Sequence, residues 1–341
     1  MTPLVERFRA QARQCAEHGS PLTAALLYGA AADYEGGGPV RELLAPHAED
    51  PSGTVPSLRL AGALHRLVLE RRAPGLALHY PSVGGTAPPE RAWDAARAVV
   101  AEQSDELRSG LLRPVQTNEV GRAAVLFGAL CDLPQPLRLL EIGASAGLNL
   151  HVDRFAYDTG ERVLGNPASP VRLMRPWSGR TRSGTPRIVE RAGCDRAPLD
   201  PASPADRLTL TSYVWADQVE RFERLRAALQ VAAAHPLVVE SLTASAFLDR
   251  ELAEPRPGVT TVVWHSLVWQ YLETAERTAI DQVLTRAGRR ATPEAPLAHV
   301  SLEPDRVGDG HRFTIRRTVW PGGQSQVLGT ANGHGPPVVW S

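Results

Sequence analysis

The stretch Leu137-Arg-Leu-Leu-Glu-Ile-Gly-Ala-Ser-Ala-Gly-Leu-Asn-Leu150 decides the fold, because an apolar run leads directly into a glycine-rich segment. The run from Leu137 to Ile142 predicts a buried strand in which Glu141 is the one acid. Gly143 and Gly147 have no Cβ to block a ligand that approaches the main chain. We therefore expect a strand, a tight turn and then a helix whose first N–H groups face a bound cofactor.

Glycine-rich loops of different function differ in their spacing. A dinucleotide-binding loop has G-x-G-x-x-G, whereas this chain has G-x-x-x-G with Ser145 in the middle. A P-loop requires a lysine after its second glycine, and the sequence contains no lysine. The missing lysine also excludes Schiff-base chemistry on a lysine amine. The G-x-S-x-G spacing matches a hydrolase elbow, so an acyl-transfer Ser145 with Asp249 and either His265 or His299 stays an alternative.

The composition indicates an ordinary globular enzyme. The chain has 341 residues, 43% of them hydrophobic, and a formal net charge of zero, which argues against a nonspecific nucleic-acid binder or a polybasic membrane anchor. Cys15, Cys131 and Cys194 are widely separated, so neither a disulfide framework nor a cysteine zinc site is indicated. No histidine pattern suggests a metal, and no signal peptide or long apolar run is present. We expect a cytoplasmic protein with a small-molecule partner, without nucleic acid or membrane; its oligomeric state stays open.

The pattern of apolar residues changes along the chain. Residues 1–133 read as an N-terminal helical region, with helices at about 21–34, 56–71, 89–111 and 118–130. Residues 134–341 alternate between strands and helices. Strands are expected at 137–142, 187–195, 236–240, 259–266 and 297–303, and helices at 217–234 and 274–287. Residues 208–215 are either a strand or an approach to the next helix, and 311–320 with 326–330 form a terminal hairpin. The fold class is therefore α/β, a doubly wound, mostly parallel sheet.

Polar residues stand where the predicted strands end. Asp195 ends one strand, Glu240 another, and His265 and Ser266 a third. In a doubly wound sheet these ends share the edge at which ligands bind. Upstream, Gln116-Thr-Asn-Glu-Val-Gly-Arg122 precedes the first strand by one helix. In that motif Asn118 is either a helix cap or a ligand contact, and Arg122 either pairs with Glu119 or grips a carboxylate.

An acid two residues before the first glycine and a second glycine four residues later resemble motif I of class I S-adenosylmethionine-dependent methyltransferases. This resemblance implies S-adenosylmethionine as cofactor, with Asp195 on the ribose hydroxyls and Glu240 near the adenine. The gap between Gly147 and Asp195 is longer than is usual in that family, so Asp153 and Asp158 compete for the ribose. Together with the upstream motif, the cofactor-binding residues are expected to be Glu141, Gly143, Ser145, Gly147, Asn149, Asp195, Glu240, Gln116, Asn118 and Arg122.

The segment Val262-Val-Trp-His-Ser-Leu-Val-Trp-Gln-Tyr271 would face the transferred methyl group in such a fold. His265 is expected to assist deprotonation of an acceptor, because its ordinary pKa is near neutral, and Tyr271 is the second catalytic candidate. Trp269 and Tyr271 either shape an acceptor pocket, hold a sulfonium by cation–π attraction, or simply pack in the core. The expected substrate-contacting residues are His79, Tyr80, Ser266 and Trp269.

Over nearly its whole length the chain is similar to an uncharacterised bacterial family known only as a domain of unknown function. The motifs that carry this similarity include Leu78-His-Tyr-Pro-Ser82, Trp215-Ala-Asp-Gln218 and Trp320-Pro-Gly-Gly323. That family brings no established reaction. We expect a methyltransferase that acts on a small acceptor, with the helical region as a cap over the substrate. Another chemistry of the same sulfonium, such as intramolecular displacement, and noncatalytic ligand binding remain alternatives.

Overall fold

The computed structural model describes residues 3–51, 54–180, 183–307 and 310–341. The chain divides into two compact units. The helical unit consists of Met1–Thr117 and Pro204–Glu223, and the sheet unit consists of Asn118–Ser203 and Arg224–Ser341. This division differs from the expected one at residue 133, because the segment that precedes the first strand belongs with the sheet and a later excursion belongs with the helices.

The helical unit contains short helices, most of which begin with a proline. Proline suits this position because its fixed φ fits a helix and its missing N–H would have no intrahelical partner there. The α-helices are α1 (Pro3–Glu17), α2 (Pro21–Glu35), α3 (Pro39–Leu44), α4 (Pro56–Leu69), α5 (Pro74–Ala77), α6 (Ala92–Glu102), α7 (Ser104–Leu111) and α9 (Pro204–Ser212). The described residues between them include the 3₁₀ turns η1 (Ala45–His47), η3 (Pro81–Val83) and η4 (Pro89–Arg91).

Helices α2 and α4 confirm two of the predicted segments, and the apolar residues Leu60, Leu64, Leu67 and Val68 of α4 are buried. Ser20 precedes α2 but does not cap it through its side chain. Its Oγ donates to Asp217 and is hydrogen-bonded to the hydroxyl of Thr23, and it is the Asp217 carboxylate that accepts the N–H of Leu22. The motifs around residues 20 and 217 therefore serve to attach α2 to the later segment of the same unit.

Two other expectations for this unit are wrong. The single helix predicted over 89–111 is broken at Gln103, where φ −125° and ψ 38° end α6 before α7 begins. Residues 208–215 do not form a strand, since most of them lie in or just after α9. Pro204 and Asp206 in the first turn of α9 are helix-start signals that outweigh the β-branched residues after them.

The sheet unit contains all the strands of the described chain. They are β1 (Leu137–Ile142), β2 (Ala156–Asp158), β3 (Val163–Gly165), β4 (Arg172–Met174), β5 (Trp177–Gly179), β6 (Ile188–Asp195), β7 (Val239–Ser241), β8 (Thr260–Ser266), β9 (Leu297–Val307), β10 (Gly310–Trp320), β11 (Gln324–Asn332) and β12 (Gly335–Trp340). Its helical segments are η5 (Val120–Arg122), α8 (Ala123–Leu130), η6 (Leu148–Arg154), α11 (Ala244–Glu251), η7 (Trp269–Tyr271) and α12 (Thr274–Gly288), and α10 (Val219–Ala234) enters this unit at residue 224.

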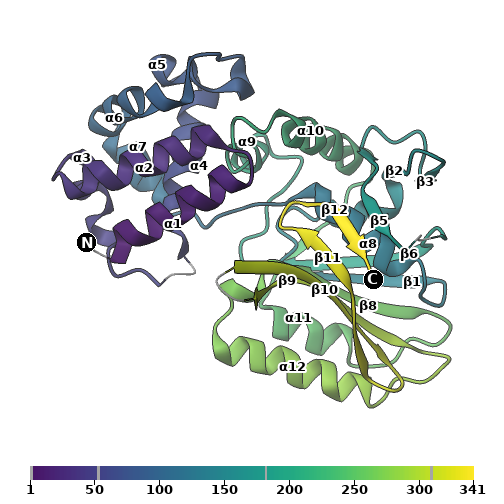
Figure 1. Cartoon of the computed structure of the whole chain (residues 1–341). Coiled ribbons are helices and arrows are strands. Elements are labelled where there is room, and N and C mark those ends of the chain that lie inside the picture. The colour runs from purple at the N-terminus through teal and green to yellow at the C-terminus, as the bar shows by residue number, and fades with distance from the viewer. Residues whose placement is uncertain (1–2, 52–53, 181–182, 308–309) are drawn as a thin grey trace. The chain divides into compact units, whose positions relative to one another are not determined.

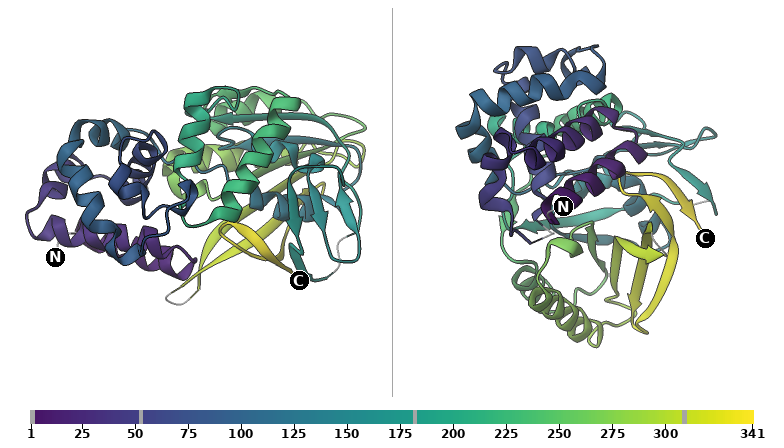
Figure 2. Two further views of the ribbon diagram at one scale, coloured as in Figure 1. Left: turned by 90° about the horizontal axis from the view of Figure 1, so that it is seen from above. Right: turned by 60° about the vertical axis from the view of Figure 1, so that its left-hand side comes forward.

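The main sheet has nine strands in the order β5-β12-β11-β10-β9-β8-β1-β6-β7. Strands β7, β6, β1, β8 and β9 are parallel to one another. The pairs β9–β10, β10–β11 and β11–β12 are antiparallel, which confirms the terminal hairpin of β10 and β11 and extends it by β12. These antiparallel strands form a twisted ribbon in Figures 1 and 2. The sheet is thus a mixed α/β sheet with a parallel centre.

The parallel centre of the sheet is buried. All six residues of β1 are buried, as expected for a central parallel strand. On one face, α11 and α12 pack against Leu140, Ile142 and Val263 (Figure 1). Figure 1 also shows α10 on the other side of the sheet from these two helices. This placement is expected for right-handed crossovers, which lie on opposite faces when they run in opposite directions along the sheet. The connection from β6 to β7 through α10 runs in one direction, and those from β7 to β8 through α11 and from β8 to β9 through α12 run in the other.

The connection from β1 to β6 differs from the predicted strand, turn and helix. After the glycine-rich loop comes η6, a 3₁₀ segment interrupted at His151 (φ −93°, ψ 19°), in place of a regular helix. The insertion noted in the sequence folds as a separate three-stranded sheet in the order β3-β2-β4. Among the described residues, no helix is long and apolar enough to span a membrane.

Candidate functional site

The strand order reverses at β1. From β1 the chain adds β6 and then β7 on one side, and it later adds β8 and β9 on the other side. In open α/β sheets, ligands bind outside the carboxyl ends of the strands at such a reversal. The residues at the carboxyl ends of β1, β6 and β8 therefore form the candidate site, and all of them belong to the sheet unit.

The glycine-rich loop leaves β1 with an unusual backbone. Gly143, Ser145 and Gly147 have φ of +67°, +53° and +71°, a region that costs a residue with a side chain about 1 kcal/mol or more. A Cβ on Gly143 would lie 2.4 Å from Cγ2 of Val268, and one on Gly147 would lie 2.9 Å from Cδ1 of Leu237. Side chains of the protein therefore fill the Cβ positions of these glycines, and the approach of a cofactor to the loop main chain stays a prediction.

Two of the predicted residues hold this loop in place. Asp195 ends β6, and its two carboxylate oxygens accept the N–H groups of Ser145 and Ala197, each at 2.9 Å. Asn118 accepts the N–H of Leu148 through Oδ1 at 2.9 Å. Asp195 and Asn118 therefore both bind the main chain of the loop, and their contacts with a ligand stay a prediction.

The competing acids lie in other ion pairs. Asp153 forms a two-pronged pair with Arg191, at 2.8 and 3.0 Å. Asp158, in the small sheet, pairs with Arg172 at 3.0 Å. Of the three acids considered for a ribose, only Asp195 hydrogen-bonds to the glycine-rich loop in the described structure.

Glu141 is a buried carboxyl group at the end of β1, 3% exposed. Its Oε2 has no hydrogen-bond partner within the described residues, and the same holds for the Nε1 of Trp264, which is paired with it in register on β8. Burial raises the pKa of Glu141 to about 8; Trp264 and the guanidinium of Arg122 lower it, and Asp195 raises it further. Glu141 is thus mainly protonated at neutral pH.

A second buried acceptor lies just after the loop. The amide nitrogen of Asn149 donates to the carbonyl oxygen of Glu119 at 3.3 Å, which fixes the orientation of the amide. Its Oδ1 is buried and has no partner in the part of the chain that the structure describes. Glu119 itself pairs with Arg224 at 3.2 Å and accepts the N–H of Gly121. Asn149 therefore presents an acceptor that the protein does not satisfy.

Arg122 connects the upstream motif to the end of β8. Its Nε donates to the carbonyl oxygen of Gly333 at 3.0 Å, and its Nη1 donates to that of Ser266 at 3.3 Å. It also lowers the pKa of Glu141 and partly offsets the burial that raises the pKa of Tyr271. The structure thus brings Arg122, Glu141, Ser266 and Tyr271 to one region, and their roles toward a ligand stay a prediction.

His265 does not have the free ring nitrogen that a general base needs. Its Nδ1 lies 2.8 Å from Oε1 of Glu303, and its Nε2 lies 3.0 Å from Nε2 of His299. Trp269 stacks on the ring, with centroids 5.1 Å apart. The same Glu303 oxygen accepts the N–H groups of Val268 and Trp269. His265 and Trp269 are therefore parts of a buried network that fixes the loop after β8.

A hydrolase triad through Ser145 is not assembled. Asp249 forms an ion pair with Arg286, and His265 and His299 hydrogen-bond to each other. Burial and His265 lower the pKa of His299 to about 3, so its imidazole is neutral. The three residues considered as partners of Ser145 are thus engaged elsewhere.

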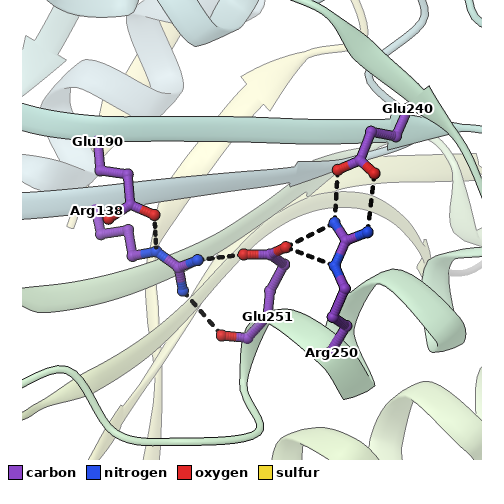
Figure 3. A network of polar contacts seen from close by, with 5 residues as sticks. All are labelled: Arg138, Glu190, Glu240, Arg250 and Glu251. Atoms are coloured by element: carbon purple, nitrogen blue, oxygen red, sulfur yellow. Dashed lines mark hydrogen bonds and ion pairs between the residues drawn. The ribbon is translucent and has the colours of Figure 1, made fainter.

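Glu240, expected near an adenine, lies in an ion-pair network (Figure 3). Its carboxylate accepts two hydrogen bonds from Arg250, at 2.5 and 2.8 Å, and Arg250 also binds Glu251. Glu251 in turn pairs with Arg138, which is 1% exposed and also binds Glu190 at 2.6 Å. These contacts give Glu240 a structural role at the edge strand β7.

Three predicted residues belong to the helical unit. His79 is bound through Nδ1 to the carbonyl oxygen of Pro88 at 2.8 Å. Tyr80 is buried against the ring of His65, with centroids 5.3 Å apart. Gln116 is also buried. Within their own unit these three residues occupy packed positions.

The sequence interpretation missed Glu303 and Trp264, and it considered His299 only as a partner of Ser145. His299, Ser301 and Glu303 alternate along β9, a period that places them on one face of a strand. That alternation of polar residues in an otherwise apolar strand was the available signal. Among the described residues, no group of three potential ligands could hold a metal ion.

An open α/β sheet with a polar edge at its point of reversal defines a general class of ligand-binding proteins. Residues 5–340 match the family model described as "Uncharacterized protein conserved in bacteria (DUF2332)", and the chain belongs to this family. No curated protein and no solved structure matches the chain.

Proposed function

We propose that this protein is an S-adenosylmethionine-dependent methyltransferase that acts on a small-molecule acceptor. The proposal is supported by the parallel order β7-β6-β1-β8-β9 with its reversal at β1, and by the glycine-rich loop at that point. It is also supported by Asp195, whose carboxylate lies at the loop and offers acceptor oxygens for a vicinal diol.

The observation that carries the proposal is the buried Oε2 of Glu141, which has no hydrogen-bond partner among the described residues. A buried polar atom without a partner costs about 1–3 kcal/mol, so a ligand that supplies the partner gains this free energy on binding. The amino-acid end of S-adenosylmethionine carries an ammonium group, which donates three hydrogen bonds and favours an ionised carboxylate. Asn149 offers a second acceptor at the other end of the loop. NAD has no ammonium group to place there.

The residues of the chain would act mainly by positioning. The cofactor supplies an electrophilic methyl group, and transfer requires that the acceptor be held in line with it. The ring nitrogens of His265 are bound to Glu303 and His299, so the proposal does not use His265 as a base. Tyr271, 43% exposed in the loop after β8, is a side chain there that can contact an acceptor. An acceptor that is already a nucleophile at neutral pH fits this arrangement.

The engaged nitrogens of His265 also favour a second candidate, a noncatalytic protein that binds the same cofactor. Both candidates predict binding, and only the first predicts turnover. Other chemistry on the same sulfonium would release methylthioadenosine in place of S-adenosylhomocysteine, so product analysis after incubation with candidate acceptors separates the three possibilities.

The test is calorimetric titration of the full-length protein with S-adenosylmethionine and S-adenosylhomocysteine, with NAD as the control ligand. Saturable binding of the first two alone supports the proposal. The variant Glu141→Gln should weaken both interactions at least about tenfold, equivalent to about 1.4 kcal/mol. The matched variant Glu161→Gln changes an exposed residue of the small insertion and should bind like the wild type. Absence of binding in folded wild-type protein would refute the proposal.

A further inference from the structure

A serine and a histidine lie within hydrogen-bond distance in the helical unit. Nε2 of His65, on α4, is 2.9 Å from Oγ of Ser82, in η3. Nδ1 of His65 is 3.1 Å from the carbonyl oxygen of Ser212. A carbonyl oxygen can only accept, so Nδ1 carries the proton and Nε2 presents its lone pair to the Ser82 hydroxyl. This is the geometry of a serine with its general base, oriented by a third group.

The surroundings hold both residues in this arrangement. His65 is buried, and Tyr80 and Phe222 pack against its ring with centroids 5.3 and 5.5 Å away. The N–H of Ser82 donates to the carbonyl oxygen of Ala216 at 2.9 Å. Ser82 is itself only half-buried, so its hydroxyl belongs to a residue that solvent and small reagents reach. A buried base next to a partly exposed hydroxyl is what a reactive serine requires.

The loop after Ser82 is rigid for a steric reason. A Cβ on Gly85 would lie 2.3 Å from the carbonyl oxygen of Ala77 and 2.6 Å from the nitrogen of Tyr80, so this turn packs on its own preceding chain. Gly84 has φ +86°, which a glycine adopts without strain. The turn therefore holds the main chain next to Ser82, whose hydroxyl is hydrogen-bonded to His65 on α4.

We infer that Ser82 and His65 form a nucleophile–base pair that reacts with activated acyl esters, a site separate from the one in the sheet unit. The Ser82 oxygen attacks the acyl carbon while its proton passes to Nε2 of His65. The ester C–O bond breaks, and the leaving phenol or alcohol takes that proton. Water then attacks the acyl-serine and gives a proton to Nε2, and the serine oxygen recovers its proton as the acid is released.

The neighbouring main chain limits the substrate class. The N–H groups of Val83 and Gly85 donate to the carbonyl oxygen of Tyr80, and that of Gly84 donates to Pro81. These amides do not serve as an oxyanion hole, and loss of one such donor typically costs about 10²–10³ in rate. The pair is thus suited to esters with good leaving groups, and amides should not react.

The test uses the full chain with two reagents, a fluorophosphonate probe and p-nitrophenyl acetate. The serine oxygen attacks the phosphorus of the probe and fluoride leaves, which gives a covalent adduct. We expect a covalent adduct on the peptide that contains Ser82, located by mass spectrometry, and release of nitrophenolate. Ser82→Ala should abolish both, whereas Ser325→Ala, a change at an exposed serine of β11, should change neither. A folded wild-type protein without the adduct, or with an adduct that persists in Ser82→Ala, would overturn the inference.

The role of His65 has its own readout. Burial lowers the pKa of His65 to about 4. Hydrogen bonds to the main chain at Ser212 and Val214 raise this pKa but offset only part of the effect of burial. Tyr80, whose pKa burial and Asp217 raise, is the other titratable side chain against the ring. The labelling rate should rise through about pH 4 and then stay level through neutral pH. A rate that keeps rising with hydroxide concentration would show that His65 is not the base, even if His65→Gln fails to fold.

Where His65→Gln does fold, labelling should slow by roughly a hundredfold or more, the usual range for loss of a general base. Unchanged labelling in that variant would contradict the assigned pair. Since S-adenosylmethionine binding is not part of this test, its outcome is independent of the function proposed for the sheet unit.

Discussion

The change Glu141→Gln tests the electrostatic state of the candidate site without any ligand. The carboxyl pKa rises from its ordinary 4.5 to about 8 in the folded protein, first because it is buried. Between these values the unfolded chain has lost this proton and the folded chain has kept it. The unfolded state then binds fewer protons, so the free energy of unfolding falls as pH rises.

The magnitude follows from the two pKa values. One pKa unit corresponds to about 1.4 kcal/mol, so the slope is about 1.4 kcal/mol per pH unit over that window. Across the whole window from 4.5 to about 8 the sum is about 5 kcal/mol. This contribution is fully present below about pH 4.5 and is lost by about pH 8. Glutamine does not ionise, so the variant should lack this slope and gain stability relative to the wild type as pH rises.

Other groups titrate in the same range, and the comparison of variants removes them. Burial lowers the pKa of His65 and of His151 to about 4, which makes the unfolding free energy rise with pH up to the ordinary histidine pKa. These terms are the same in both proteins and cancel in the difference. Glu161→Gln, at an exposed position, serves as the matched control.

The assay is urea unfolding of the three proteins between about pH 5 and about pH 8, followed by circular dichroism and tryptophan fluorescence. The difference in unfolding free energy between Glu141→Gln and the wild type should grow steadily across this range. A difference that stays constant with pH would refute a protonated Glu141, and with it the electrostatic description of the site.

Three more changes have defined outcomes. Gly143→Ala places a Cβ against Val268 at a residue with positive φ, so it should lower the unfolding free energy by about 2 kcal/mol or more. Thermal melting measures this loss, and an unchanged melting temperature would contradict the packing described. Asp195→Ala should weaken S-adenosylmethionine binding at least about tenfold in calorimetry, whereas Asp153→Ala should leave it unchanged. If Asp153→Ala weakened binding and Asp195→Ala did not, the ribose contact would have to be assigned to Asp153. Arg138→Ala leaves the carboxylates of Glu190 and Glu251 without their buried partner and should lower the unfolding free energy by about 3–5 kcal/mol in urea unfolding. A loss below about 1 kcal/mol would show that these two ion pairs are not effectively buried.

The parallel centre of the fold was predictable because its signals are local. A largely apolar run predicts a buried parallel strand, and β1 and β8 lie where such runs were read; β6 lies where a strand ending in an acid was predicted. The break at Gln103 was missed because apolar residues continue past it in helical register. Ser104 with the acids after it is a helix-start signal inside that run, and it decides the local structure.

The candidate site was predictable only in part. Asp195 and Asn118 meet at one loop because strand ends and the segment before β1 converge there, whereas their contacts with a cofactor stay a prediction. The hydrogen bond between His265 and Glu303 was not predictable, because the position of Glu303 depends on the loop after β8, whose N–H groups it also binds. That loop contains Leu267 with φ +53°, a conformation that nothing in the identity of a leucine indicates.

The most direct test of the central claim is the number of protons released when S-adenosylmethionine binds at neutral pH. Calorimetric titration in two buffers of different ionisation enthalpy gives this number. An ammonium group placed against Glu141 should drive off its proton, so the wild type should release about one proton and any binding by Glu141→Gln should release none. Binding without proton release, or the same release from the variant, would contradict the placement of the cofactor at Glu141.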